Sequence, residues 1–121
     1  MNAQCYLCRV CCYLLQIRMA AAAPVPALRS LHCDSESLVT FISRTQRPFC
    51  VYWLDYQGRR VRYCQLNYAQ QFNIHTYETH PWIFRDSETG DTLVTADGSE
   101  VYMPKKWDGG HGDHVIIGLP G

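Results

Sequence analysis

The chain has 121 residues, of which eleven are Lys or Arg and eleven are Asp or Glu, and its hydrophobic share is 47%. This length suffices for one hydrophobic core but not for two ordinary domains, and the hydrophobic share is that of a folded protein rather than a disordered one. The balanced charge supplies no overall field that would attract nucleic acid or an anionic membrane, so we expect neither as a partner.

Residues 1–27 are predicted to be a flexible extension ahead of the folded domain. Four of the seven cysteines lie in its first twelve residues: Cys5, Cys8, Cys11 and Cys12. Gln16 and Arg18 interrupt its apolar run and no basic start precedes it, so it is a poor secretion signal. The run is also shorter than the roughly 18 apolar residues of a membrane span. The odd cysteine count favours free thiols in a reducing compartment.

Short apolar or alternating runs, separated by turn residues every eight to twelve positions, fill residues 28–121 and predict eight strands. Their expected bounds are Leu38–Ser43, Phe49–Asp55, Val61–Leu66, Gln71–Tyr77, Trp82–Arg85, Thr92–Thr95, Glu100–Met103 and Val115–Gly118. This spacing is typical of a β-sandwich or a small barrel, and no segment has sustained helical periodicity. We therefore predict an all-β domain over residues 28–121, with a long loop at residues 104–114.

Enzyme motifs are missing from this sequence. It has no G-x-S-x-G nucleophile turn and no glycine-rich phosphate loop that opens a helix. Cys50 or Cys64 could act as a nucleophile with a histidine, but both lie in predicted strands, where cysteine usually serves as a small buried hydrophobe. We expect no enzymatic activity and no cofactor.

A metal site is an open alternative, because four histidines and a carboxylate could supply ligands. These residues are His75, His80, His111, His114 and Asp113. Their spacing gives little support, since His75 and His80 are on either side of a predicted turn, while His111 and His114 fall in the predicted glycine-rich loop. We therefore expect no bound metal.

The stretch IHTYETHPWIFRD, residues 74–86, is rich in aromatic faces and neutral hydrogen-bonding groups. A slot with flat walls could be lined by three aromatic residues, Trp53, Tyr63 and Trp82. The hydroxyl of Thr76 and the imidazole of His80 could both form hydrogen bonds with one oxygen atom of a ligand. Core packing is the simpler interpretation for any one of the three aromatic residues. Together, the five residues suit a neutral ring that carries a single hydroxyl, such as a modified proline in an extended peptide.

These residues resemble those of the von Hippel-Lindau family. The resemblance rests on HTYETHPWIFRD at residues 75–86, WLDYQG at residues 53–58 and LRSL at residues 28–31. It implies a seven- to eight-stranded β-sandwich of the von Hippel-Lindau β-domain type. It also implies a non-enzymatic substrate receptor that binds hypoxia-inducible factor alpha after prolyl 4-hydroxylation, in the cytoplasm and nucleus.

The resemblance further assigns a role to each site residue. Thr76 and His80 would contact the 4-hydroxyl, and Trp82 would lie against the pyrrolidine ring. Trp53 and Tyr63 would complete the walls, while two further residues would meet flanking peptide groups: His75 and Tyr77. The chain departs from the family pattern at Thr76, where serine is usual, and at Cys64, where proline is usual.

In the full family, a helical α domain links the receptor to elongin B, elongin C and a cullin-RING ubiquitin ligase. The present sequence ends at HVIIGLPG, so the elongin C site is expected to be absent. A truncated isoform and a paralogue that protects its substrate are both compatible with that expectation. Two alternatives stay open: an inactive β-sandwich fragment and a histidine-based metal-binding sandwich.

Overall fold

A computed structural model describes residues 28–121, and the predicted extension at residues 1–27 lies outside the described residues. Within residues 28–121 there are eight strands and no helix. The strands are β1 (Glu36–Ser43), β2 (Phe49–Leu54), β3 (Arg60–Leu66), β4 (Gln71–Tyr77), β5 (Trp82–Asp86), β6 (Val94–Thr95), β7 (Val101–Tyr102) and β8 (Asp113–Gly118). Each predicted strand is therefore confirmed, and β4 has the predicted bounds.

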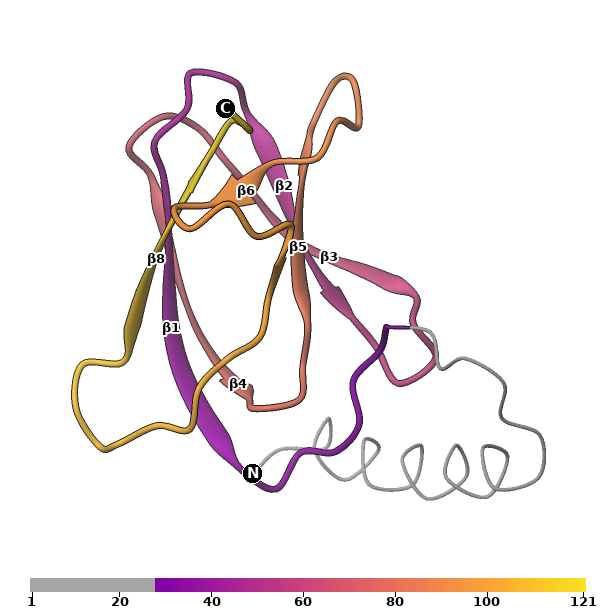
Figure 1. Ribbon diagram of the computed structural model, residues 1–121, viewed down its shortest axis with the longest axis vertical. Helices are drawn as coiled ribbons and strands as arrows, with labels where there is room; N and C mark the ends of the chain where they lie inside the picture. The colour runs from indigo at the N-terminus through magenta and orange to yellow at the C-terminus, as the bar shows by residue number, and fades with distance from the viewer. Residues whose placement is uncertain (1–27) are drawn as a thin grey trace.

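The strands form two four-stranded sheets that face each other as a sandwich. The first sheet has the order β4-β1-β8-β6 and the second has the order β3-β2-β5-β7. Figure 1 shows β1, β4 and β8 on one side of the molecule, with β2, β3 and β5 on the other. The sandwich prediction is confirmed, and the barrel alternative is wrong.

Aromatic side chains from both sheets make the core. Phe41 of β1 lies 5.2 Å from Phe84 and 5.5 Å from Trp82, measured between ring centroids, and 5.7 Å from Tyr102. Alternation along β1 places Phe41 on the inner face together with Val39, and both are fully buried. The period-2 pattern of the sequence thus decides which face of the sheet becomes core.

The chain crosses from one sheet to the other between β3 and β4. A tight turn closes there, with the amide of Gln70 donating to the carbonyl of Asn67 at 3.0 Å. Both β3 and β4 are outer strands of their sheets. The crossing therefore joins an edge strand of one sheet to an edge strand of the other, and it brings Tyr63 of β3 and Thr76 of β4 to the same side of the sandwich as the crossing.

The long loop was predicted two residues too long at its C-terminal end. Strand β8 begins at Asp113, so His114 is an exposed strand residue rather than a loop residue. The parallel register of β8 with β1 explains the difference, because Val39 pairs with Asp113 and Thr40 with His114. Sheet pairing overrides the local preference of a glycine-rich sequence.

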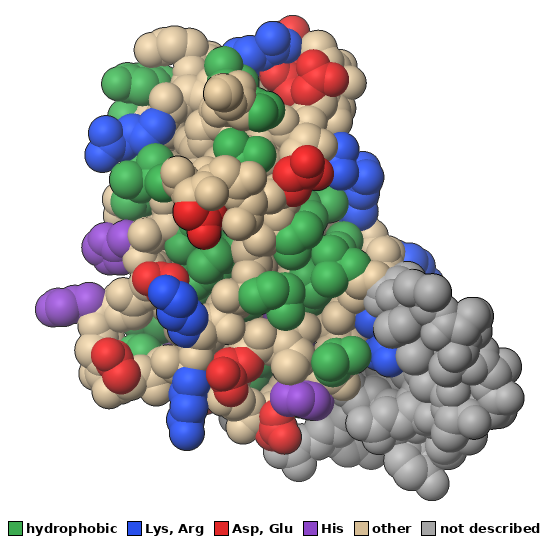
Figure 2. All heavy atoms as spheres, viewed as in Figure 1, with side chains coloured by type: hydrophobic (Ala, Val, Ile, Leu, Met, Phe, Trp, Pro, Cys, Tyr) green, Lys and Arg blue, Asp and Glu red, His purple; other side chains and the backbone are tan. Residues whose placement is uncertain are grey.

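Figure 2 shows charged side chains of both signs scattered over the visible face of the molecule. This pattern agrees with the balanced composition and offers no single charged surface there. Among residues 28–121, no helix is long and apolar enough to span a membrane.

Candidate functional site

The candidate site draws its residues from strands of both sheets and from the turn between β4 and β5. Strand β2 supplies Trp53, β3 supplies Tyr63, β4 supplies Thr76, and β5 supplies Trp82. His80 follows the turn between β4 and β5, where its amide donates to the carbonyl of Tyr77 at 3.0 Å. Residues from two sheets are thereby brought to one place.

Three aromatic rings of the candidate site pack against one another. The ring centroid of Tyr63 lies 5.0 Å from that of Trp82 and 6.4 Å from that of Trp53, and both pairs have edge-to-face geometry. The Trp53 ring also stacks on the His80 ring at 5.1 Å, with 22° between their planes. Offset and edge-to-face contacts are the favoured aromatic geometries, so the rings support one another without a ligand.

The Thr76 hydroxyl is fixed by Trp82. The side chain of Thr76 is buried, and its Oγ1 accepts the indole Nε1–H of Trp82 at 3.1 Å. Because the indole can only donate, the hydroxyl proton of Thr76 remains able to donate to another acceptor. Trp82 therefore sets the direction in which the Thr76 hydroxyl can donate its proton to a ligand.

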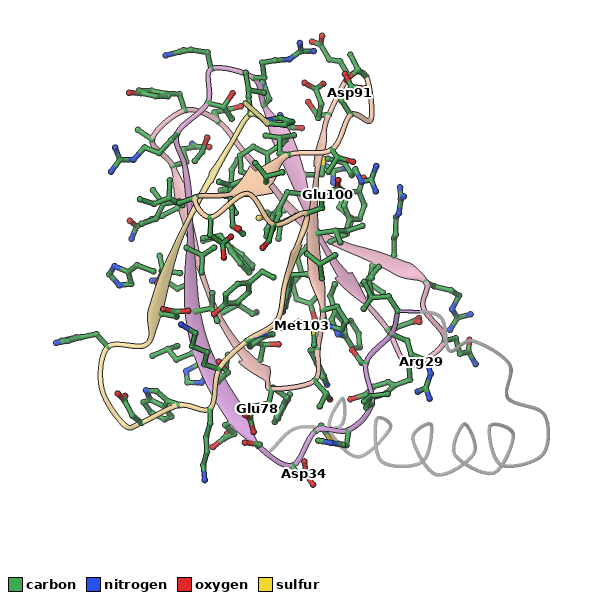
Figure 3. All side chains as sticks on the ribbon, in the orientation of Figure 1. Arg29, Asp34, Glu78, Asp91, Glu100 and Met103 are labelled. Atoms are coloured by element: carbon green, nitrogen blue, oxygen red, sulfur yellow. The ribbon has the colours of Figure 1, made fainter. Side chains whose placement is uncertain are left out.

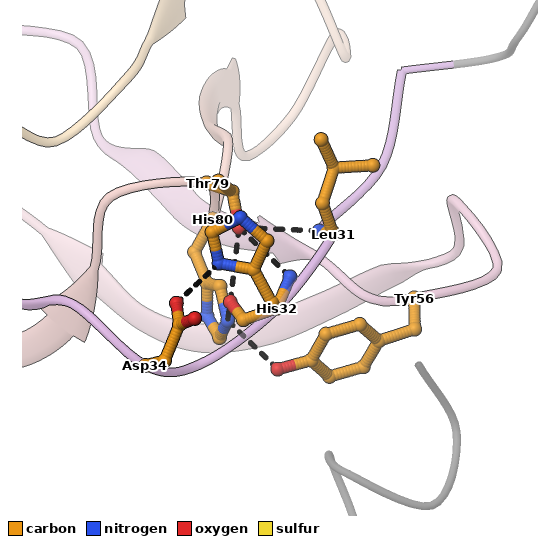
Figure 4. Close-up of polar contacts among 6 residues, drawn as sticks. All are labelled: Leu31, His32, Asp34, Tyr56, Thr79 and His80. Carbon is orange, nitrogen blue, oxygen red and sulfur yellow. Dashed lines mark hydrogen bonds and ion pairs between the residues drawn. The ribbon is translucent and has the colours of Figure 1, made fainter. Parts of the chain in front are cut away.

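His80 is buried, and its Nε2 contacts two oxygen atoms (Figure 4). One is the backbone carbonyl of His32 at 3.0 Å, and the other is the hydroxyl of Tyr56 at 2.8 Å. A carbonyl can only accept, so this bond requires the proton to be on Nε2. Burial lowers the pKa of His80 to about 4, which keeps the ring neutral at pH 7. Nδ1 of that neutral ring is consequently a hydrogen-bond acceptor.

The segment of residues 28–35, here called the N-terminal strap, holds His32 in place. Ser30 anchors the strap, because its Oγ donates to the carbonyl of Leu54 at 2.6 Å and accepts the indole N–H of Trp53 at 2.7 Å. Figure 3 shows Asp34, from the strap, and Glu78, from the β4–β5 turn, at the same end of the molecule. The strap thus connects one wall of the site to the carbonyl that orients His80.

Comparison with known proteins gives this arrangement a family. The family model described as VHL beta domain matches residues 28–110. The chain belongs to the VHL beta domain family. Protein Vhl of Drosophila melanogaster is 33% identical over 58 residues, which are 48% of this chain and 33% of that protein. The chain therefore spans about a third of the length of this curated relative.

Of the seven residues predicted for the recognition site, the VHL-type domain brings six together. Besides the five described above, Tyr77 lies 5.1 Å from His80 between ring centroids and is half-buried. His75 is on the opposite face of β4, is exposed, and has its ring 6.0 Å from that of Trp107. The structure therefore separates His75 from the slot, and a peptide-binding role for His75 stays a prediction.

Four contributors to the candidate site were not predicted from the sequence. They are Ser30, His32, Tyr56 and Thr79. The quoted motifs LRSL and WLDYQG already contain Ser30 and Tyr56, so the resemblance offered a signal for these two. His32 and Thr79 act through a contact between positions 47 residues apart, which no local pattern indicates.

The metal alternative is not supported by the geometry. Within residues 28–121, no group of three or more His, Cys, Asp or Glu side chains is placed to hold a metal ion. His80 uses Nε2 for protein contacts, while His111 and His114 are exposed in a loop and a strand. The four histidines are dispersed because β4, its turn and β8 place them at different parts of the sandwich.

The cysteines of β2 and β3 do not provide an activated nucleophile. Cys50 and Cys64 are free thiols, and Cys50 is buried. Burial, followed by the nearby Cys50, raises the pKa of Cys64 to about 11, although Arg62 opposes this shift. A thiol with so high a pKa is protonated at pH 7, whereas cysteine catalysis uses the thiolate.

The low pKa of His80 predicts a loss of stability in mild acid. The unfolded chain protonates this ring near pH 6.5, while the folded chain resists protonation until about pH 4. Stability should therefore be independent of this group above pH 6.5 and fall between pH 6.5 and 4, by up to about 3 kcal/mol. Urea unfolding of the wild type and of His80→Gln at pH 7 and pH 4.5 measures this contribution.

His80→Gln should lose less stability between the two pH values than the wild type does, because glutamine cannot take up a proton. The titration of Asp86 does not interfere with this comparison between pH 7 and pH 4.5. Amides of Thr89 and Glu88 lower the pKa of Asp86 below 3.8, so its contribution is lost only in stronger acid. Equal losses in the two proteins would contradict the assignment to His80.

Proposed function

We propose that this chain is a non-enzymatic recognition domain that binds 4-hydroxyproline within an extended peptide, as in hypoxia-inducible factor alpha. The observation that carries the proposal is the set of buried groups: a Thr76 hydroxyl that accepts from Trp82 and can still donate, and a neutral His80 ring, stacked on Trp53, whose Nδ1 can accept. Membership of the VHL beta domain family supports the same function.

A hydroxyl on the ligand would satisfy both polar groups, the Thr76 hydroxyl and Nδ1 of His80. Its oxygen would accept the proton of Thr76, and its own proton would be donated to Nδ1 of His80. An unmodified proline would leave both groups unpaired and removed from water. Each unpaired group costs about 1–3 kcal/mol, so the two together predict a strong preference for the hydroxylated ligand.

The edge position of β4 suits an extended peptide. β4 pairs with β1 in antiparallel register, from the pair Gln71 and Ile42 to the pair Tyr77 and Glu36. It is the end strand of its sheet. An extended peptide could add to such an edge by backbone hydrogen bonds and place alternate side chains toward the slot. In this arrangement, Tyr77 and His75, which share the face of β4 opposite to Thr76, would meet groups of the peptide on either side of the hydroxyproline.

Calorimetric titration with two synthetic peptides tests the proposal. The peptides are identical except that one carries a single 4-hydroxyproline. We expect the hydroxylated peptide to bind at least about thirtyfold more tightly, from two paired polar groups at about 1–3 kcal/mol each. Equal binding, or no binding of either peptide to a folded chain, would refute the proposal.

The wider role is part of the same proposal. We propose that the domain performs the substrate-binding step of a von Hippel-Lindau-type receptor, and that it acts in the cytoplasm and nucleus. Free thiols at Cys50 and Cys64 are compatible with a reducing compartment.

A further inference from the structure

Two residues outside the predicted slot, Tyr56 and Thr79, control the surroundings of His80. Tyr56 is buried, and its hydroxyl lies 2.8 Å from Nε2 of His80, with the two rings edge to face at 5.4 Å. Thr79 immediately precedes His80 and contacts the strap instead of the ring (Figure 4). The two hydroxyls therefore act on the same ring by different routes.

The Thr79 side chain forms hydrogen bonds with both the backbone N–H and the backbone carbonyl of His32. Its Oγ1 donates to the carbonyl of His32 at 2.9 Å and accepts the amide N–H of His32 at 2.9 Å. The amide of Leu31 also donates to this oxygen at 3.3 Å. These contacts fix the direction of the carbonyl that accepts the Nε2 proton of His80.

Tyr56 is the competing partner for Nε2. A phenol hydroxyl can accept a hydrogen bond from Nε2–H, but it can also donate to an unprotonated Nε2. The second arrangement would move the ring proton to Nδ1 and turn that nitrogen from an acceptor into a donor. The His32 carbonyl excludes that arrangement for as long as it points at Nε2.

We propose that Thr79 is a positioning residue that, through the His32 carbonyl, keeps His80 in its Nε2-protonated form against Tyr56 and thereby sets the selectivity for a hydroxyl. This inference rests on the proposed function for its ligand, whereas the position of the ring proton is a property of the free protein. Removing the Thr79 hydroxyl frees the carbonyl to turn away. The strap itself stays attached, because Ser30 anchors it independently.

The first experiment locates the ring proton in the free protein. Long-range proton–nitrogen NMR spectra of histidine-labelled protein at pH 7 distinguish protonated from unprotonated ring nitrogens, and His80→Gln identifies the His80 signals. We expect protonated Nε2 in the wild type and in Thr79→Ser, and a shift toward protonated Nδ1 in Thr79→Val. The double variant Thr79→Val, Tyr56→Phe lacks the competing donor and should return to protonated Nε2.

The second experiment measures selectivity with the paired peptides described above. Thr79→Val should reduce the ratio of the two affinities by about fivefold or more, the size of one mispaired buried group, and Thr79→Ser should preserve it. Thr79→Ala is measured in parallel, so that unfolding of one variant does not decide the result. A folded Thr79→Val or Thr79→Ala protein with unchanged ring protonation, or with changed protonation and unchanged selectivity, would overturn the inference.

The two proposals fail in different ways. A wild type without any preference for the hydroxylated peptide would refute the proposed function, and with it the selectivity part of the inference. The NMR comparison would still decide whether Thr79 and Tyr56 set the protonation of His80.

Discussion

Replacing Thr76 with valine is expected to remove most of the preference for a hydroxylated peptide while preserving the shape of the slot. Valine has the same branched form as threonine, but it can neither donate to a ligand hydroxyl nor accept from Trp82. The loss of one buried pairing corresponds to about 1–3 kcal/mol, or roughly a 5- to 150-fold fall in the affinity for the hydroxylated peptide. Calorimetric titration with the paired peptides measures it.

Thr76→Ser is the matched control for this prediction. Serine keeps the hydroxyl and removes only the methyl group. It is also the residue that the family pattern has at this position. We expect Thr76→Ser to retain the preference, and any gain in affinity would show that the methyl group crowds the ligand. Thr76→Val also leaves the Nε1–H of Trp82 without this acceptor, so its folding must be checked by thermal unfolding. Undiminished selectivity in folded Thr76→Val would contradict the assigned contact.

The strands could be predicted because their signals are local. β4 was predicted with its observed bounds, since alternation starts after a turn at residues 67–70 and ends at Glu78. The short strands β6 and β7 were predicted too long, at Thr92–Thr95 and Glu100–Met103, against observed spans of Val94–Thr95 and Val101–Tyr102. Pairing at the edges of the sheets ends these two strands, and the sequence of each strand alone does not specify its pairing.

The site was only partly predictable for a related reason. Three residues of the site could be found from the sequence alone: Trp53, Thr76 and Trp82. Thr76 and Trp82 belong to the stretch at residues 74–86, which is rich in aromatic and polar side chains, and Trp53 belongs to the motif WLDYQG. The contacts that orient His80 come from His32 and Tyr56, which lie 48 and 24 residues away along the chain. Such contacts appear only once the strap and the β2–β3 turn are placed against the β4–β5 turn.

Trp82 is expected to show the largest effect on stability of any site residue. It is 1% exposed, and its ring packs between Phe41 and Tyr63, at 5.5 and 5.0 Å between centroids. Trp82→Ala should lower the free energy of unfolding by about 3–5 kcal/mol, because it removes buried apolar area and leaves a cavity. A domain of this size typically has only about 5–15 kcal/mol of stability, so urea unfolding should show a markedly lowered midpoint.

Trp107→Ala provides the comparison for this prediction. Trp107 is the same residue type, but it lies half-buried in the loop before β8, where its indole donates to the carbonyl of Gly110 at 2.9 Å. Its loss should cost about 1 kcal/mol, as for an ordinary substitution outside the core. Equal effects of the two substitutions would mean that Trp82 does not belong to the core.

Trp82→Phe then separates the two roles of the residue. Phenylalanine keeps an aromatic ring against Phe41 and Tyr63 but cannot donate to Thr76. We expect Trp82→Phe to remain folded and to bind the hydroxylated peptide more weakly, because the Thr76 hydroxyl is no longer held in one direction. Full affinity in Trp82→Phe would show that packing alone orients Thr76. Because this wall is also the core, substitutions that alter the slot must be judged on binding and unfolding together.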